Sequence, residues 1–360
     1  MSIEKYETKA GIRWCVQYYK PDGTKSRKRN FRTKRAATQW ELETITAIKK
    51  GVWIDPKKGE ITFGQLGDEW IKRQTHLKPS SLRDLTTSWE SRVKPYWGNR
   101  PIGSIRHTEV QSWISNLTNM RNGRPLSPTG KAYALQCIHN ILADAVRDGL
   151  IPTNPALEVK VPPKVRKNAR YLTIQELRSL AAAAGQYEAL ILILGACGLR
   201  WGEAIALTPA DIDFLRRRIS ITKNAVWVGA KVEVGSPKTW ENRTVPIPEF
   251  LIPPLDKAMR GKPPSALIFT NRNGGYLKRP STRDGWWARA LKDAAIEPLT
   301  AHELRHTCAS LAVRAGASVK ALQAMLGHRS AAMTLDVYAD LFDDELDSVA
   351  AALSALAENS

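Results

Sequence analysis

Apolar and polar residues alternate near the start of the chain. Every second position of one segment is apolar, which is the period of a half-buried strand: Ile12, Trp14, Val16 and Tyr18. The Pro-Asp-Gly tripeptide at 21–23 predicts a turn, and a second strand is expected at 24–31. Thr33 can then cap a helix with one apolar face: Ala37, Trp40, Thr44 and Ile48. Residues 1–58 therefore predict a small sheet packed on one helix.

From Thr62 onward, apolar residues recur at helical spacing. The pattern predicts four helices, at 63–74, 81–94, 108–117 and 127–148. Residue types that favour the N-cap stand at their starts: Thr62, Ser80, Thr108 and Ser127. Pro128 at the first position of the fourth helix and Gly149 after its end fit the usual asymmetry of helix termini. Residues 59–158 are expected to form a helical domain.

After residue 170 the pattern is mostly helical, with one β interlude. Thr173 can cap the first helix, and an apolar helix at 189–196 ends at Gly198. Arg200 lies at the next helix start, beside glycines that let a ligand approach the backbone closely. Short strands are expected at 219–228, 231–234 and 243–247. Residues 171–360 predict a mixed, mostly α domain with a small β-sheet.

The last quarter of the chain begins with a helix that gathers polar side chains. A start at Thr300 or Ala301 places three of them at i, i+3 and i+4: His302, Arg305 and His306. These positions share one helix face, so the three side chains are expected to act together.

Two more helices follow in this part of the chain. The first of them, at 319–326, ends at Gly327, and His328 comes directly after this glycine. Ser330 can cap the next helix, which carries Tyr338. Polar groups at helix ends like these are expected to face a cleft.

Two chemistries compete for this cluster. Residues 302–306 read HELRH, which matches H-E-x-x-H, the helical zinc pair with a glutamate base. The alternative is an anion site, in which imidazoles and an arginine surround a phosphate and a tyrosine hydroxyl is the nucleophile. The zinc interpretation lacks an evident third ligand and places Arg305 beside a dication, so it is the weaker of the two.

The charge of the chain favours a polyanionic partner. The 360 residues carry a net charge of +19, and the pI is near 9.9. Almost half of the excess lies in residues 1–58, which hold 15 Lys and Arg against 6 Asp and Glu. The second strand is the densest part, and four of its residues are expected to contact DNA in a major groove: Lys25, Arg27, Lys28 and Arg29. A merely soluble basic protein is the alternative.

Residues 159–170, VKVPPKVRKNAR, mark the clearest domain boundary. Adjacent prolines exclude a helix interior, and the basic side chains leave little to bury. A flexible strap that contacts DNA is one interpretation, through Lys160, Lys164, Arg166 and Lys167. An ordinary solvated linker is equally compatible with the composition.

Cysteine spacing and hydropathy exclude several classes of protein. The four cysteines are far apart without a C-x-x-C pair, so neither a disulfide framework nor a cysteine zinc site is expected. The N-terminus has no signal-peptide pattern, and the longest apolar run, at 189–199, is too short to span a bilayer. We therefore expect a soluble cytoplasmic protein without a membrane partner.

Five separated segments carry the candidate chemistry in a fixed order: ACGLRWGEAIAL, SPKTWENRTVPIP, HELRHT, LGHRS and Tyr338. They resemble the active-site motifs of the tyrosine recombinases, the phage-integrase family, and the resemblance covers residues 60–345. It implies a catalytic set with Glu203 in support: Arg200, Lys238, His302, Arg305, His328 and Tyr338. Glu303 stands where most relatives have aspartate. The family uses no metal, and the resemblance implies no cofactor.

The same resemblance assigns the domains. Residues 1–58 resemble the arm-binding domain of large integrases, and 59–158 resemble the SAM-like core-binding domain. The linker at 159–170 precedes a domain, 171–360, that resembles the tyrosine-recombinase catalytic fold. The implied fold is multidomain and mainly α, with small sheets at the N-terminus and in the catalytic domain.

The implied function is site-specific integration and excision of phage or mobile-element DNA through a 3′-phosphotyrosine intermediate. Arg200 and Arg305 would grip the scissile phosphate with His328, Lys238 would protonate the departing 5′ oxygen, and His302 would accept the tyrosine proton. Implied partners are duplex DNA with core and arm sites, three further copies of the chain in a tetramer, and DNA-bending and directionality factors in a bacterial host. A catalytically inactive DNA-binding relative and a relaxing topoisomerase are the alternatives.

Overall fold

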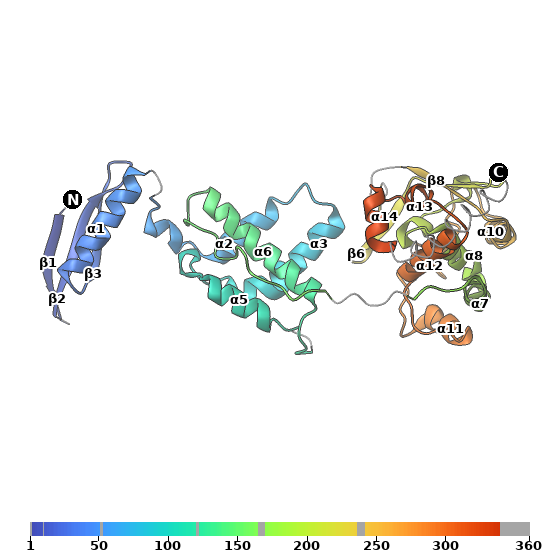
Figure 1. Cartoon of the computed structure of the whole chain (residues 1–360), viewed down its shortest axis with the longest axis horizontal. Coiled ribbons are helices and arrows are strands. Elements are labelled where there is room, and N and C mark those ends of the chain that lie inside the picture. The colour runs from blue at the N-terminus through green and yellow to red at the C-terminus, as the bar shows by residue number, and fades with distance from the viewer. Residues whose placement is uncertain are drawn as a thin grey trace, which may run out of the picture. The chain divides into compact units, whose positions relative to one another are not determined.

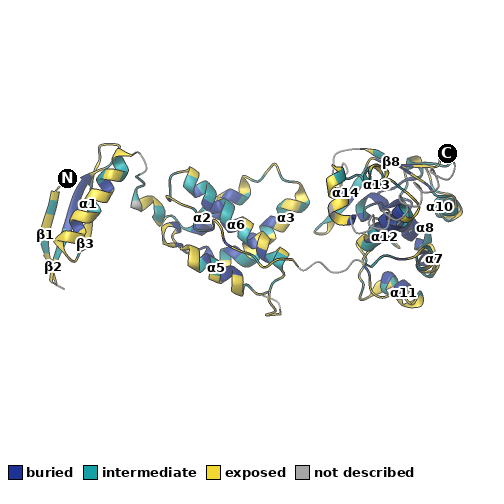
Figure 2. Cartoon of the chain, in the orientation of Figure 1, coloured by how far each residue is buried: buried dark blue, intermediate teal, exposed yellow. Residues whose placement is uncertain are grey.

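The computed structural model describes residues 2–9, 11–50, 53–119, 122–164, 170–235 and 242–338. Its contacts divide the chain into two compact units, Met1–Val165 and Arg166–Ser360. The division lies inside the basic linker expected from the sequence. Each unit contains a hydrophobic core of its own (Figure 2).

The first unit begins with a three-stranded antiparallel sheet, in the order β1 (Ser2–Thr8), β2 (Gly11–Tyr19) and β3 (Lys25–Phe31). The helix α1 (Lys34–Lys49) covers one face of this sheet (Figure 1), and the rings of Tyr18 and Trp40 meet edge-on at 5.2 Å. The two expected strands and the helix capped by Thr33 are confirmed. Sequence reasoning misses β1, because this edge strand has no fully buried residue and therefore no apolar face.

The rest of the first unit is helical: α2 (Phe63–Lys72), α3 (Pro79–Ser88), α4 (Lys94–Trp97), α5 (His107–Asn116) and α6 (Pro128–Arg147). A π-helical turn, Trp89–Val93, joins α3 to α4. Short 3-10 turns lie at Pro56–Glu60 and Ile102–Ser104. The tryptophan and isoleucine side chains of these helices form the core, for example Trp89, Trp97, Ile138 and Ile141.

Two of the four N-caps expected in this helical part are wrong. The helix α3 begins at Pro79 rather than after Ser80, because proline is well suited to the first helical turn. The helix α5 begins before Thr108, because the Glu109 carboxylate accepts a hydrogen bond from the Arg106 backbone amide at 3.2 Å. The other two caps are confirmed by their hydrogen bonds: Thr62 and Ser127.

The second unit is mainly helical: α7 (Ile174–Ala183), α8 (Glu188–Leu192), α9 (Trp201–Ala204), α10 (Ile252–Met259), α11 (Gly285–Asp293), α12 (Ala301–Arg314), α13 (Val319–Leu326) and α14 (Ala331–Tyr338). The helix α8 continues as a π-helical turn, Ile193–Cys197. Short 3-10 turns lie at Gly185–Tyr187, Pro209–Asp211 and Glu249–Leu251. The buried helix α12 packs against this π-helical turn and brings distant parts of the chain together (Figure 2).

Two small antiparallel sheets complete the second unit. One has the order β4 (Ile212–Asp213), β5 (Arg218–Ile221) and β8 (Arg243–Pro246), and the other pairs β6 (Asn224–Val228) with β7 (Lys231–Gly235). The single strand expected at 219–228 is wrong. The chain changes sheets around Lys223, whose ammonium pairs with Asp211 at 3.2 Å. Alternation alone does not reveal which partner strand each half will meet.

The expected architecture, mainly α with small sheets, is confirmed. Within the described part of the chain, no helix is both long and apolar enough to cross a membrane.

Candidate active site

The first residue of the candidate active site along the chain is a glycine in the left-handed backbone conformation. Gly198 ends the π-helical turn after α8 with φ of +67°, as the sequence predicts. A side chain here would be crowded, because a Cβ atom would lie 2.7 Å from Leu326 and 3.0 Å from the Cys308 sulfur. The Gly198 carbonyl accepts a hydrogen bond from Arg305 Nη1 at 2.6 Å. This glycine therefore lets two distant segments meet.

Arg200 is the N-cap of α9 and is held mainly by Glu203. Its backbone amide donates to Glu203 Oε2 at 2.8 Å, and its Nη1 donates to Glu203 Oε1 at 2.9 Å. Nη2 donates to the Gly327 carbonyl at 3.2 Å. The Arg200 side chain is 20% exposed. The guanidinium is thus held in place while part of the side chain stays accessible.

Arg305 lies on α12 and is only 2% exposed. Nη1 and Nη2 donate to the carbonyls of Gly198 and Leu326, each at 2.6 Å. Burial, with repulsion from Arg200, lowers the pKa of Arg305 to about 10, so the guanidinium still carries its charge at neutral pH. Both of these acceptors are neutral carbonyls, which leave the positive charge free to attract an anion.

Tyr338 ends the described part of α14 and is 2% exposed. Its hydroxyl oxygen lies 2.8 Å from His306 Nδ1. The His328 ring is parallel to the tyrosine ring, with centroids 6.4 Å apart and an interplanar angle of 7°. The rings of His302 and His306 are 5.0 Å apart. The helices α12 and α14, with the turn that precedes α14, thereby bring three histidines and one tyrosine together.

His328 is positioned by the turn between α13 and α14. Gly327 is left-handed with φ of +64°, and the His328 backbone amide donates to the Gln323 carbonyl at 3.1 Å. His328 Nδ1 lies 2.9 Å from the Thr334 hydroxyl on α14. Ser330 accepts a hydrogen bond from the Met333 amide at 3.3 Å, so the expected cap of α14 is confirmed.

The electrostatics of the site keep both the tyrosine and the histidines neutral. Burial raises the pKa of Tyr338 to about 12. Partial desolvation, together with nearby cationic groups, lowers the pKa of His302 and of His328 to about 4. Desolvation also lowers the pKa of His306 below its ordinary value. At neutral pH the tyrosine therefore holds its proton and the imidazoles can accept one.

Two protein-family models match the chain, and one of them covers the residues of this site. Residues 170–345 match the model of the phage integrase family, and residues 62–118 match that of the phage integrase N-terminal SAM-like domain. The chain belongs to the phage integrase family. It is a tyrosine recombinase, an enzyme of site-specific DNA recombination.

Known integrases resemble the chain over most of its length. The integrase of Mycobacterium phage D29 is 26% identical over 329 residues, which cover 85% of this chain and 84% of that protein. The Tn1549 transposon integrase in complex with a circular intermediate DNA has a TM-score of 0.67 at 23% identity, covering 80% and 99% of the two chains. A lambda integrase tetramer bound to a Holliday junction has a TM-score of 0.58 at 18% identity, covering 91% and 95%. The two structural likenesses establish a shared fold.

Most of the expected integrase motif residues come together in the second unit: Arg200, Glu203, His302, Arg305, His328 and Tyr338. Lys238 lies outside the described residues, and so do Arg166 and Lys167 of the linker. Lys160 and Lys164 are exposed, and the Lys160 backbone amide donates to Gln111 at 2.9 Å. The start of the linker is therefore hydrogen-bonded to α5 of the first unit.

The basic residues of β3 do not share one face of the integrase sheet. Lys28 pairs with the buried Val16, which lies on the face covered by α1. Arg27 and Lys25 alternate with that position and belong to the open face. Arg29 falls at a register shift between the two strands. Only part of the expected DNA-contact set therefore lies on the open face.

The geometry does not favour zinc. Among the described residues, no group of three His, Cys, Asp or Glu side chains is placed to hold a metal ion. His306 directs Nδ1 toward the Tyr338 hydroxyl, and the charged Arg305 adjoins both histidines of the H-E-x-x-H pattern.

Sequence reasoning misses one arginine of the site. Arg243, the first residue of β8, donates to both carboxylate oxygens of Glu203, at 3.0 and 2.7 Å. It lies 40 residues from Glu203, and no local pattern announces the pairing. Sequence reasoning also associates His302 with the tyrosine, whereas His306 is the histidine that meets the hydroxyl.

Proposed function

We propose that the chain cuts and rejoins DNA through a 3′-phosphotyrosine, with Tyr338 as the nucleophile. Its hydroxyl oxygen forms a bond to the scissile phosphorus, and the bond from phosphorus to the 5′ oxygen breaks. A 5′-hydroxyl of another strand reverses the step, so the reaction needs no ATP. The contact between the Tyr338 hydroxyl and His306, beside the buried Arg305, is the observation that carries this proposal.

Arg200 and Arg305 are proposed to hold the two non-bridging oxygens of the phosphate. Their guanidinium groups are fixed by Glu203 and by backbone carbonyls before DNA arrives. Such preorganised donors stabilise the extra charge of the pentavalent transition state, and removing one costs on the order of 3–4 kcal/mol of barrier. The pair supplies the positive charge for which many nucleases use a metal ion. His328 adds a hydrogen bond to the same phosphate.

His306 is proposed to accept the tyrosine proton, in place of the His302 assigned from the sequence. In the tautomer with the proton on Nε2, His306 Nδ1 accepts the hydrogen bond of the Tyr338 hydroxyl. The lowered pKa of His306 keeps this nitrogen unprotonated at neutral pH. His302 lies exposed beside it and is left to contact the phosphate.

Lys238 is proposed to protonate the departing 5′ oxygen. Its assignment rests on the family motif, because residues 236–241 lie outside the described part of the chain. The flanking strands β7 and β8 end and begin on either side of this segment.

The assembly is also a proposal. Residues 59–158 and 171–360 would each contact the core site, with the linker at 159–170 against DNA, and residues 1–58 would bind arm sites. Four copies would act together, as in the lambda integrase tetramer on a Holliday junction. We place the reaction in the bacterial cytoplasm, on phage or mobile-element DNA, with DNA-bending and directionality factors.

The decisive experiment compares Tyr338→Phe with Tyr187→Phe on DNA that carries an attachment site. Tyr187 is a suitable control, because its hydroxyl bonds the Thr270 carbonyl in another part of the unit. After denaturation, a covalent protein–DNA adduct is expected from the unmodified protein and from Tyr187→Phe. No adduct is expected from Tyr338→Phe, while DNA affinity stays within about threefold, because phosphate contacts elsewhere supply it. An adduct in Tyr338→Phe would refute the assignment, and none in any protein would favour an inactive relative.

A further inference from the structure

The C-terminus of α13 holds three arginines through three consecutive carbonyls. Arg243 Nε donates to Met325 at 3.1 Å, Arg305 Nη2 to Leu326 at 2.6 Å, and Arg200 Nη2 to Gly327 at 3.2 Å. The last carbonyls of a helix have no partner inside the helix and carry partial negative charge. One helix end therefore orients both phosphate-binding arginines together with Arg243.

Glu203 joins the same cluster from the other side. Its side chain is fully buried, and its two oxygens accept bonds from the backbone amide and Nη1 of Arg200 and from both terminal nitrogens of Arg243. The pKa of Glu203 is lowered: desolvation opposes the charged form, but the bonds and charges of Arg243 and Arg200 outweigh it. A buried carboxylate is retained only when it is paired in this way.

Arg243 differs from the phosphate-binding arginines in how its donors are used. All three of its nitrogens have acceptors within the protein, and two of these bonds end on a carboxylate that neutralises its charge. Arg200 and Arg305 each use only two side-chain nitrogens in the hydrogen bonds described above. Arg243 is therefore poorly placed to bind a phosphate and well placed to support groups that do.

We propose that Arg243 is a positioning residue, which fixes Glu203 and the α13 C-terminus so that Arg200 and Arg305 meet the scissile phosphate in one geometry. The inference rests on the proposed function of these two arginines.

Removal of the Arg243 guanidinium takes two hydrogen bonds away from the Glu203 carboxylate. The carboxylate then keeps only the Arg200 bonds, so it draws Arg200 toward itself and away from a bound phosphate. The Met325 carbonyl also loses the hydrogen bond from Arg243 Nε. We expect slower chemistry on bound DNA with little change in DNA affinity.

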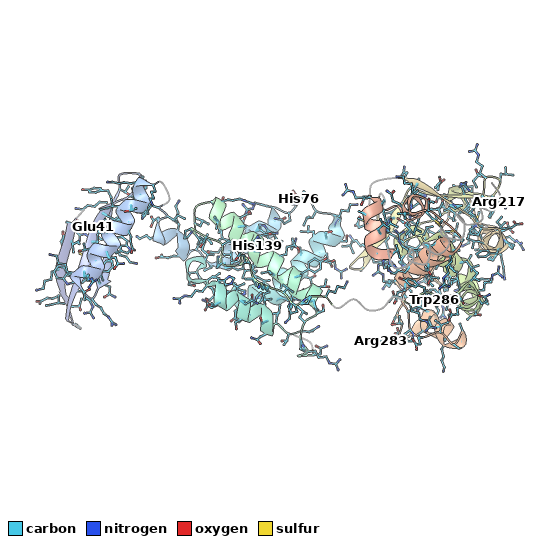
Figure 3. All side chains as sticks on the ribbon, in the orientation of Figure 1. Glu41, His76, His139, Arg217, Arg283 and Trp286 are labelled. Atoms are coloured by element: carbon cyan, nitrogen blue, oxygen red, sulfur yellow. The ribbon has the colours of Figure 1, made fainter. Side chains whose placement is uncertain are left out.

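The test measures adduct formation in single turnover at saturating DNA for Arg243→Gln, Arg243→Lys and the control Arg217→Gln. Arg217 is an exposed arginine at the periphery of the second unit (Figure 3) and pairs with Glu249 at 3.4 Å. Arg243→Gln should be slower by about 10- to 100-fold, less than the effect of removing a direct oxyanion donor. Arg243→Lys should be intermediate, because it restores the charge but not both bonds to Glu203. Arg217→Gln should match the unmodified protein.

A second substrate separates positioning from misfolding. Replacing one non-bridging oxygen of the scissile phosphate by a methyl group removes the charge that Arg200 is proposed to stabilise. The defects of Arg243→Gln and Arg200→Gln should then both shrink by about tenfold or more. An equal defect of Arg243→Gln on both substrates, or none on either, would overturn the positioning role. If the unmodified protein forms no adduct at Tyr338, the proposed function has failed instead.

Discussion

At the scale of single residues, the proposed mechanism depends on the position of one proton. Tyr338 has a pKa of about 12, raised by burial, and is a poor nucleophile until the proton leaves. His306 can take it only while it is neutral, and desolvation lowers its pKa below the ordinary value of 6.5. The acceptor is therefore mostly neutral at pH 7 and is lost as the pH falls below 6.5 and through the lowered pKa of His306.

We predict that the rate of adduct formation on pre-bound DNA stays level from about pH 8 to about pH 6.5 and falls below it. His306→Asn should be slower by about 100-fold or more and should lose this acid limb, since its side chain does not titrate. His302→Asn should keep the limb. Rapid-quench assays across this pH range check the prediction. A limb that vanishes in His302→Asn and persists in His306→Asn would return the acceptor role to His302.

At the scale of elements, one glycine sets how closely α12 and α13 approach the π-helical turn. Gly198 is left-handed, and its carbonyl accepts a hydrogen bond from Arg305. A Cβ atom added here would crowd the side chains of Leu326 and Cys308. Alanine there adds backbone strain of about 1–2 kcal/mol and crowding of about 1–3 kcal/mol. Gly185 has a similar φ of +58°, but a Cβ there would meet nothing within 4 Å.

We therefore predict that Gly198→Ala lowers the free energy of unfolding by about 2–5 kcal/mol, against about 1–2 kcal/mol for Gly185→Ala. Urea unfolding monitored by tryptophan fluorescence measures both. Gly198→Ala should also slow adduct formation, because the Gly198 carbonyl orients Arg305, whereas Gly185→Ala should not. Equal effects of the two substitutions on stability and rate would contradict the packing argument.

At the scale of the whole molecule, we propose separate roles for the two ends of the chain: residues 1–58 bind DNA and the second unit cleaves it. The N-terminal sheet presents Lys25 and Arg27 on its open face, and residues 1–58 carry nearly half of the net charge. The candidate active site lies entirely within the second unit. Under the proposed function, binding of distant arm sites and cleavage of the core site are therefore separable.

A protein without residues 1–58 should still form the Tyr338 adduct on a short core duplex, and should fail to recombine a substrate with flanking arm sites. Its binding to long DNA should be less dependent on salt, because the salt slope falls by about 0.9 for every phosphate that the shortened protein no longer neutralises. Adduct assays and salt titrations measure the two effects. Recombination equal to that of the full chain would remove the arm-binding assignment.

Features that depend on neighbouring residues were predictable from the sequence alone. The caps at Thr33, Thr62 and Ser127 follow from hydrogen bonds within three residues, and the left-handed ends at Gly198 and Gly327 follow from the lack of a side chain. The motif order was sufficient to identify the family, because five separated segments occur in the family's order.

The tertiary structure decided which residues far apart in the sequence come into contact. His306 rather than His302 meets Tyr338, 32 residues away, because α14 packs against one part of the α12 face. The pairing of Arg243 with Glu203 across 40 residues, and the change of sheets at Lys223, depend on the same kind of packing. Local patterns state which face of an element is buried. They do not state which partner buries it, because that choice is made by the energy of the assembled core.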